Sequence, residues 1–371
     1  MSEGPIATLY PDGRVVEWDG RTSFLPSLPT FQIAWDSTSL GTLKECPRKY
    51  QLSIVEGWRG RGESLHLRWG QLYHRALEVY DHGIAEGMDH QDALRKCLRD
   101  LAEGCQDYSM EPCTACEGSG IQSFGPCTDC LGQGETPTAR SWWVPDVSVF
   151  AKNSAAKYKT VDALFRTVIW YLERFGVNDP AQTITLQNGK PAVELSFRFD
   201  AGFSLLGTSM LYSGHFDRVV DLNEAVWGMD RKTTGNSLSD GSALRYFDQY
   251  SPDNQMSMYT FALNVSLAVP AMGMIIDAAQ VAAGFSRFER GFALRTTAQL
   301  EEWHRDNQWW IGEAARFAQD NYWPMNDKSC DKYGGCPFRN ICKKDPAVRY
   351  IYLESSFRIE KWDPLKVRGD I

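Results

Sequence analysis

The sequence predicts an α/β protein in which strands form a central sheet and helices precede, separate and follow them. Apolar and polar residues alternate at 192–199, and two further apolar runs have the length of buried strands. Between and after these runs, apolar residues recur every three or four positions, as on one face of a helix. The expected strands cover residues 192–199, 210–234, 272–281 and 285–292, and the expected helices of this part cover 161–175, 253–267 and 300–317.

Composition sets the outer limits. The 371 residues are 43% hydrophobic and 23% charged, which suits one large domain with insertions or two ordinary domains and excludes wholesale disorder. The net charge of −8 argues against a broad electrostatic grip on nucleic acid but leaves room for a local basic channel. The apolar stretch Met258–Ile276 is broken by polar residues and Pro270, so we expect a helix and then a strand rather than a membrane span.

The N-terminal sequence lacks the basic and apolar regions of a signal peptide, so we expect a cytoplasmic protein. In such a reducing compartment the ten cysteines favour metal binding over disulfides. The expected segments are a lead with a hairpin (1–35), a helical part carrying Cys46 and His74 (36–112), a zinc-binding insertion (113–134), the core (135–295), a helix with a cysteine cluster (296–345) and a tail (346–371).

Two acids and a lysine stand in the most informative stretch, residues 214–234. Asp217 and Asp230 lie in two apolar segments joined by a turn at 221–224, so a hairpin would bring them together, with Lys232 on the same face as Asp230. Two carboxylates about 4 Å apart repel by roughly 4 kcal/mol at an effective dielectric near 20. A hard divalent ion, Mg²⁺ or Mn²⁺, would relieve that repulsion and suit phosphodiester hydrolysis. A surface ion pair explains the spacing equally well.

Residues 113–134 contain two cysteine pairs in the pattern C-x₂-C-x₁₀-C-x₂-C, each followed by x-Gly-x-Gly. Two such knuckles closing on one tetrahedral Zn²⁺ are a standard structural arrangement, with Cys113, Cys116, Cys127 and Cys130 as ligands. The stretch resembles the cysteine-rich zinc module of the DnaJ chaperones over about twenty residues. The chain has no J-domain His-Pro-Asp triplet, so the resemblance implies the metal and not the chaperone role.

Three further cysteines, Cys330, Cys336 and Cys342, follow one another as C-x₅-C-x₅-C. Three closely spaced thiolates need a fourth ligand, for which Cys46 is the candidate. Four thiolates suit either a structural Zn²⁺ or an iron–sulfur cluster, and the spacing does not choose between them.

The order of motifs resembles the RecB-like branch of the PD-(D/E)XK nuclease superfamily, and within it the iron–sulfur nucleases such as the AddB nuclease domain and the CRISPR-associated exonucleases. The resemblance spans residues 37–343. The motifs are Cys46-Pro-Arg-Lys-Tyr, Gly70-x-x-x-His74, the strand acid Glu194, Gly214-x-x-Asp217, Asp230-x-Lys232, Gln255-x-x-x-Tyr259 and the terminal cysteine triplet. Two features depart from the family: the second acid is Asp where many members have Glu, and the terminal spacing C-x₅-C replaces the common C-x₂-C.

The resemblance implies a restriction-endonuclease-like fold, a mixed central sheet flanked by helices, and a DNA nuclease. His74, Asp217, Asp230 and the backbone carbonyl of Arg231 would ligate Mg²⁺ or Mn²⁺, and Lys232 would orient the attacking water and steady the transition state. Gln255 and Tyr259 would contact DNA, and Glu194 would be a supporting acid or a solvent-facing strand residue. Cys46, Cys330, Cys336 and Cys342 would hold a [4Fe–4S] cluster.

The resemblance implies an exonuclease on single strands or duplex ends in recombination, repair or phage DNA processing. It also implies the cytoplasm of a bacterial or phage-infected host cell. The sequence has no P-loop, so a separate helicase or annealing protein would be its partner. The alternatives are a non-catalytic DNA-binding or scaffold protein on the same fold and a zinc-knuckle interaction protein.

Overall fold

A computed structural model describes most of the chain, and the expected hairpin at 6–18 lies outside the described residues. The described ranges are 22–61, 64–119, 121–122, 125–128, 135–143, 156–186, 189–267, 270–332 and 335–365. The chain divides into two compact units, one made of residues 65–173 and the other of residues 1–64 and 174–371.

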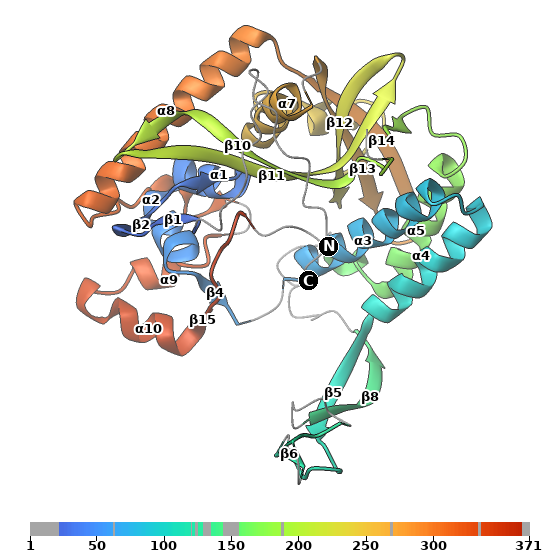
Figure 1. The fold of residues 1–371 in the computed structure, drawn as a ribbon, viewed down its shortest axis with the longest axis horizontal. Helices are drawn as coiled ribbons and strands as arrows, with labels where there is room; N and C mark the ends of the chain where they lie inside the picture. Colours follow the sequence, from blue (N-terminus) through green and yellow to red (C-terminus); the bar gives the residue numbers. More distant parts are fainter. Residues whose placement is uncertain are drawn as a thin grey trace. The chain divides into compact units, whose positions relative to one another are not determined.

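A seven-stranded mixed sheet forms the centre of the larger unit (Figure 1). Five strands lie side by side in the order β10, β11, β12, β13 and β14, and two short strands, β3 and β9, also pair with β11. Only the β12–β13 and β3–β11 pairs are parallel. The bounds are β3 Ala34–Trp35, β9 Gln182–Thr183, β10 Val193–Leu205, β11 Thr208–Leu222, β12 Ala225–Thr234, β13 Ala271–Val281 and β14 Ser286–Leu294. The predicted α/β class, a mixed central sheet flanked by helices, is confirmed.

The sequence of β13 explains its central position. Nine consecutive residues from Gly273 to Val281 are buried, as expected for a strand that is covered on both faces and paired on both edges. The only charged residue in the strand, Asp277, is paired with Arg290 of β14, so its buried charge is compensated.

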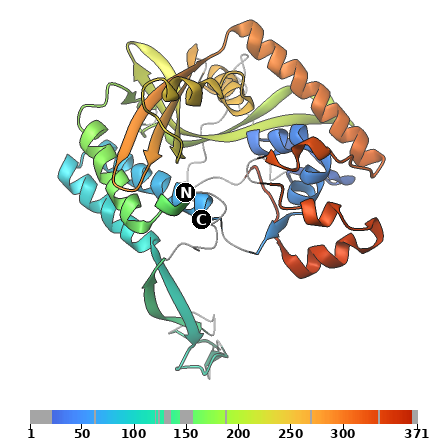
Figure 2. The same ribbon diagram turned by 180° about the vertical axis from the view of Figure 1, so that it is seen from behind.

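Helices α1 (Ser37–Glu45), α7 (Asn254–Ser266) and α8 (Thr297–Gln319) pack on one another, and α7 and α8 also contact the sheet (Figures 1 and 2). Each begins at a side-chain cap: Asp36, Asp253 and Thr296 accept a hydrogen bond from a backbone N–H in the first turn. The main core lies between these helices and the sheet. Short elements complete the unit: α2 Pro47–Tyr50, a π-helical turn at Gln51–Val55, α6 Ser242–Asp248, α9 Arg339–Cys342 and α10 Arg349–Ser356, with a small hairpin of β1 Phe24–Leu25 and β2 Leu28–Gln32.

The two ends of the larger unit are joined. Strand β4 (Trp58–Gly60) pairs antiparallel with β15 (Phe357–Ile359), and a small separate core forms around them. In that core Phe338 stacks on Phe357 with ring centroids 5.1 Å apart. The C-terminal segment therefore docks on the N-terminal part of the larger unit through apolar contacts.

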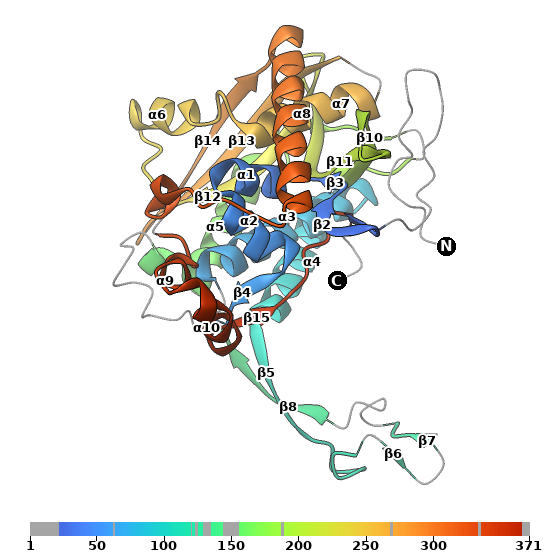
Figure 3. The same ribbon diagram turned by 90° about the vertical axis from the view of Figure 1, so that its left-hand side faces the viewer.

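The smaller unit consists of α3 (Leu65–Ala85), α4 (His90–Gly104), most of α5 (Val161–Phe175) and a two-stranded ribbon (Figure 3). The indole of Trp69 donates to the carbonyl of Thr160, and Tyr73 meets Tyr171 edge-on, which fixes α3 against α5. The ribbon pairs β5 (Gln106–Pro112) with β8 (Glu135–Trp142), and a second pair, β6 (Ile121–Gln122) and β7 (Gly125–Pro126), lies beyond it.

Most predicted elements are confirmed. The helix at 161–175 matches α5 at both ends, and the apolar stretch Met258–Ile276 divides between α7 and β13. Among the residues the structure describes, no helix has both the length and the apolar character to span a membrane.

A buried ion-pair network connects several strands of the larger unit. The Asp179 carboxylate accepts from Arg218 at 3.1 Å and from Arg290 at 2.5 Å, and Arg290 also pairs with Asp277. Burial works to raise the pKa of Asp179, but hydrogen bonding and attraction from the two arginines outweigh it, and the pKa lies below its usual range. The network links the segment before β9 to β11, β13 and β14.

We expect Asp179→Ala to destabilise the protein by about 3–5 kcal/mol near neutral pH, because two largely buried guanidinium groups lose their shared partner. Since the folded pKa of Asp179 is depressed, its contribution is complete above the ordinary carboxyl pKa of about 3.9 and is lost as the pH falls through the folded value. Urea unfolding at several pH values measures both effects, with the exposed Asp240→Ala as control. An equal loss for both variants at pH 7 would contradict the prediction.

Candidate active site

The predicted hairpin carries the candidate site and is confirmed. Strands β11 and β12 pair antiparallel from Arg218↔Met229 to Leu222↔Ala225, so Asp217 and Asp230 are the next residues along each strand. Asn223 and Glu224 form the turn with φ angles of 55° and 61°, the left-handed pair that suits a two-residue hairpin. Asp217 is 4% exposed and Asp230 is 3% exposed, which excludes a surface ion pair as the explanation of the pattern.

A backbone hydrogen bond holds the first acid, Asp217. The backbone N–H of Arg231 donates to Asp217 Oδ2 at 2.7 Å, which ties the acid of β11 to the residue between Asp230 and Lys232 on β12. Arg231 itself is 1% exposed and lies opposite Asp277 of β13. The hydrogen bond fixes the orientation of the Asp217 carboxylate relative to β12.

A chain of contacts runs from the second acid to α7. Lys232 Nζ lies 2.6 Å from Asp230 Oδ2 and donates to Gln255 Oε1 at 3.0 Å, and Gln255 Nε2 donates to the Tyr259 hydroxyl at 3.2 Å. Four of the residues predicted from sequence therefore form one connected set. The one-turn spacing of Gln255 and Tyr259 places both on the same side of α7.

The electrostatics of this set keep Lys232 charged. Burial lowers the pKa of Lys232, but attraction to Asp230, their hydrogen bond and the Asp217 charge raise it above its ordinary value. Burial, followed by repulsion from Asp230, raises the pKa of Tyr259 to about 12, so its hydroxyl remains a neutral donor. The arrangement offers two carboxylates, one ammonium and one phenol to a ligand.

Gly214 of β11 leaves room for the aromatic rings of Phe197 and Tyr259. A Cβ at Gly214 would stand 2.6 Å from the Phe197 ring and 3.2 Å from the Tyr259 ring. Phe197 and Phe216 both meet Tyr259 edge-on. The glycine of Gly214-x-x-Asp217 is therefore required mainly by the close packing of Phe197, with Tyr259 next to it.

Two further residues border the site. Glu194 of β10 has a carboxylate oxygen within 4.8 Å of one from Asp217. Tyr246 of α6 was not predicted from sequence. Its pKa is raised first by burial and then by Tyr250 and Asp230, while Lys232 works to lower it. No local motif marks Tyr246, and only the fold brings α6 near β12. The remaining predicted ligand, His74, is half-buried on α3 in the smaller unit, with its ring against Tyr73.

The four cysteines predicted as one cluster line a common cavity in the larger unit, together with Lys49, Arg339 and four other residues. Cys46 lies between α1 and α2, and Cys342 ends α9. Asn326 donates from its backbone to Cys46 Sγ at 3.3 Å, and Asn326 and Ser329 both donate to the carbonyl of Glu45. These bonds bring Cys330 to Cys46 across the length of the chain.

Basic side chains close to these cysteines oppose the effect of burial on the pKa of two thiols. Burial raises the pKa of Cys336 and of Cys342, while Lys49 works against this for Cys336 and Arg48 for Cys342. No three of the four sulfurs lie mutually within 4.8 Å, although all four cysteines are among the described residues.

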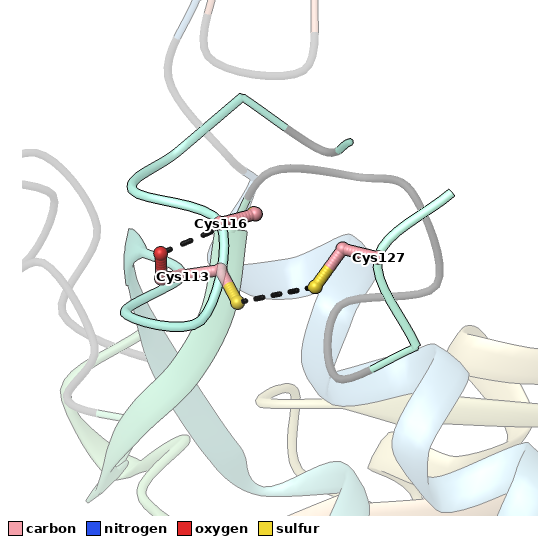
Figure 4. Close-up of side chains that lie close together, drawn as sticks. All are labelled: Cys113, Cys116 and Cys127. Carbon is pink, nitrogen blue, oxygen red and sulfur yellow. Dashed lines mark hydrogen bonds between the residues drawn. The ribbon is translucent and has the colours of Figure 1, made fainter. Parts of the chain in front are cut away.

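The knuckle cysteines form a tighter group at the end of the β5–β8 ribbon (Figures 3 and 4). Cys113, Cys116 and Cys127 are buried, with their sulfurs all within 4.8 Å of one another and 3.9 Å between Cys113 and Cys127. Gly118 has a φ of 81° and donates to the carbonyl of Cys113, which closes the first knuckle. The fourth predicted ligand, Cys130, lies outside the described residues.

The match to a family model agrees with this arrangement. A family model described as the PD-(D/E)XK nuclease superfamily matches residues 35–343. Among solved structures, a "Putative exonuclease" from Eubacterium rectale matches with a TM-score of 0.42 and 11% identity, over 91% of this chain and 98% of its own. The structure of SSO0001 matches with a TM-score of 0.26 and 12% identity, over 53% of this chain and 78% of its own. No curated protein matches in sequence.

We expect the purified protein to carry one Zn²⁺ at the knuckles and Cys127→Ser to lose it, because three sulfurs already lie at the spacing of ligands around one ion. Metal analysis after dialysis measures the zinc content. Cys97→Ser, which changes a buried cysteine of α4 away from the knuckles, is the matched control. Equal zinc in Cys127→Ser and wild type would contradict the assignment.

Proposed function

The chain belongs to the PD-(D/E)XK nuclease superfamily, and we propose that it is a deoxyribonuclease dependent on Mg²⁺ or Mn²⁺, acting as an exonuclease on single strands or duplex ends. The observation that carries the proposal is the connected set Asp230–Lys232–Gln255–Tyr259 beside the buried Asp217. A separate helicase or annealing protein is the proposed partner, and recombination, repair or phage DNA processing is the proposed role.

The donor set of β11 and β12 fits a hard divalent ion. Asp217 and Asp230 are buried carboxylates, and their oxygen atoms are the type of ligand that Mg²⁺ and Mn²⁺ prefer. We assign the ion to these two acids and, following the family resemblance, to the carbonyl of Arg231 and to His74. When bound, such an ion polarises the phosphate and lowers the pKa of a water molecule.

Lys232 has a different part. With its pKa held above the ordinary value it stays an ammonium, so it donates hydrogen bonds to a phosphate oxygen or to the attacking water and does not remove a proton itself. Asp230 and Gln255 hold it from two sides, which fixes its direction before substrate arrives. Tyr259, bonded to Gln255, remains a neutral hydroxyl suited to donate to the DNA backbone.

We further propose that Cys46, Cys330, Cys336 and Cys342 hold a [4Fe–4S] cluster. Each thiolate of such a cluster binds its own iron, so the sulfurs stand further apart than around a single Zn²⁺. The wider spacing of these four sulfurs, against the tight group at the knuckles, favours the cluster. Lys49, which lines the same cavity, favours the thiolate form of Cys336.

We expect wild type to degrade labelled DNA with Mg²⁺ or Mn²⁺, and Asp230→Asn and Lys232→Met each to lower the rate by about 10²–10³-fold, as for loss of one group that stabilises transition-state charge. Linear and circular single strands of the same sequence separate exonuclease from endonuclease action. Asp221→Asn, which changes an exposed acid on β11 of the same hairpin, is the matched control and keeps full activity. An inactive wild type, or active-site variants that cut as fast as wild type, would refute the function.

We expect anaerobically purified protein to be brown, with about four irons per chain in addition to zinc, and Cys330→Ala to lose the iron and to unfold at a lower temperature. The physical reason is that the cluster closes a very long loop between the chain ends. Iron analysis, the visible spectrum and thermal unfolding measure the three effects, with Cys105→Ala as control. A colourless protein with two zinc ions and no iron would replace the cluster with a zinc site.

A further inference from the structure

We propose that Glu194 of β10 supplies a third carboxylate to the divalent-ion site of Asp217 and Asp230. This inference rests on the proposed metal-dependent function and adds a residue to it. Three observations carry it: the register of β10 on β11, the backbone conformation of Glu194, and the charge of the group of side chains around it.

The register places Glu194 beside the first acid. Val193 pairs with Arg218 and Leu195 pairs with Phe216, so Glu194 stands opposite Asp217 across the two strands. Carboxylate oxygens of the two residues lie within 4.8 Å of each other, close enough for both to bind one ion. Asp217 is thus flanked by an acid of β10 and an acid of β12.

The backbone of Glu194 is strained, with a φ of 47°. Five other non-glycine residues in the described part of the chain have a positive φ, and each lies in a turn: Glu117, Leu206, Asn223, Glu224 and Asn321. Glu194 alone lies within a strand, where the left-handed conformation costs about 1–3 kcal/mol. Glycine would remove that cost, so the presence of glutamate points to a use for its carboxylate.

The charges around Glu194 favour a divalent cation. Lys232 is committed to Asp230 at 2.6 Å, while Glu194 lies beside Asp217. The formal charges of Glu194, Asp217, Asp230 and Lys232 add up to −2, which matches the charge of one divalent ion. Without Glu194 the other three add up to only −1.

The test is titration calorimetry of Mn²⁺ binding without DNA. The protein keeps its zinc but has been freed of Mg²⁺ and Mn²⁺. We expect Glu194→Gln to weaken Mn²⁺ binding by about 10–100-fold, the range typical of residues that support a metal site. We expect Glu194→Gly to weaken it to the same extent and, because glycine accepts the positive φ, to raise the unfolding temperature of the metal-free protein.

Glu224→Gly is the matched control, because Glu224 is also a glutamate with a positive φ but lies in the exposed turn between β11 and β12. It should raise the unfolding temperature without changing Mn²⁺ affinity. A second reference, Asp217→Asn, should lose Mn²⁺ binding.

Wild-type Mn²⁺ affinity in both Glu194 variants, alongside its loss in Asp217→Asn, would overturn the role of Glu194 and leave the proposed function standing. If wild type neither binds Mn²⁺ nor cuts DNA, the proposed function fails and this inference fails with it. Circular dichroism of each variant confirms that a loss of binding does not come from unfolding.

Discussion

The constraint on which the rest of the structure depends is the confinement of Asp217 and Asp230 on adjacent strands, away from water. Buried carboxylates on neighbouring strands are costly unless cations or hydrogen-bond donors compensate them. The Arg231 N–H and the Lys232 ammonium supply part of that compensation from β12 itself. Helix α7 then fixes Lys232 through Gln255, and Gly214 leaves the space that lets Tyr259 approach. The hairpin, the glycine and the helix thus serve one electrostatic arrangement.

A second constraint is that the sheet alone does not hold the chain ends. The segment around Pro324–Ser329 is bonded to the junction of α1 and α2, with Arg48 donating to the carbonyl of Trp323 and Asn326 donating to Cys46. The pairing of β4 with β15 and the stacking of Phe338 on Phe357 form a second connection between the N-terminal and C-terminal parts of the larger unit. Four cysteines lie where these ties meet, so a metal cluster there would close a loop that hydrogen bonds and apolar packing have already shaped.

Sequence predicted what depends on local patterns. Alternation and turn residues were enough for the β11–β12 hairpin and its two acids, amphipathic spacing for α5 and α7, and cysteine spacing for the knuckles. Contacts between side chains that lie far apart in the sequence could not be predicted from it. Nothing near Asp179 in the sequence indicates that Arg218 and Arg290 share it, and nothing near Tyr246 indicates that it lies by Lys232. The left-handed backbone of Glu194 interrupts a strand that its neighbours predict as regular, since a pattern of side chains carries no information on one residue's φ.

Several energetically unfavourable features of this chain lie at the sites that we propose for its function. A residue with positive φ inside a strand, two buried acids on adjacent strands and a π-helical turn directly after the Cys46 helix all cost stability where they stand. The surrounding elements obey those rules closely, with side-chain caps on α1, α7 and α8 and a uniformly buried β13. A fold that is locally consistent elsewhere can hold such strained positions in place. The positive φ of Glu194 and the two buried acids thus fall together on β10, β11 and β12, where we propose the metal site.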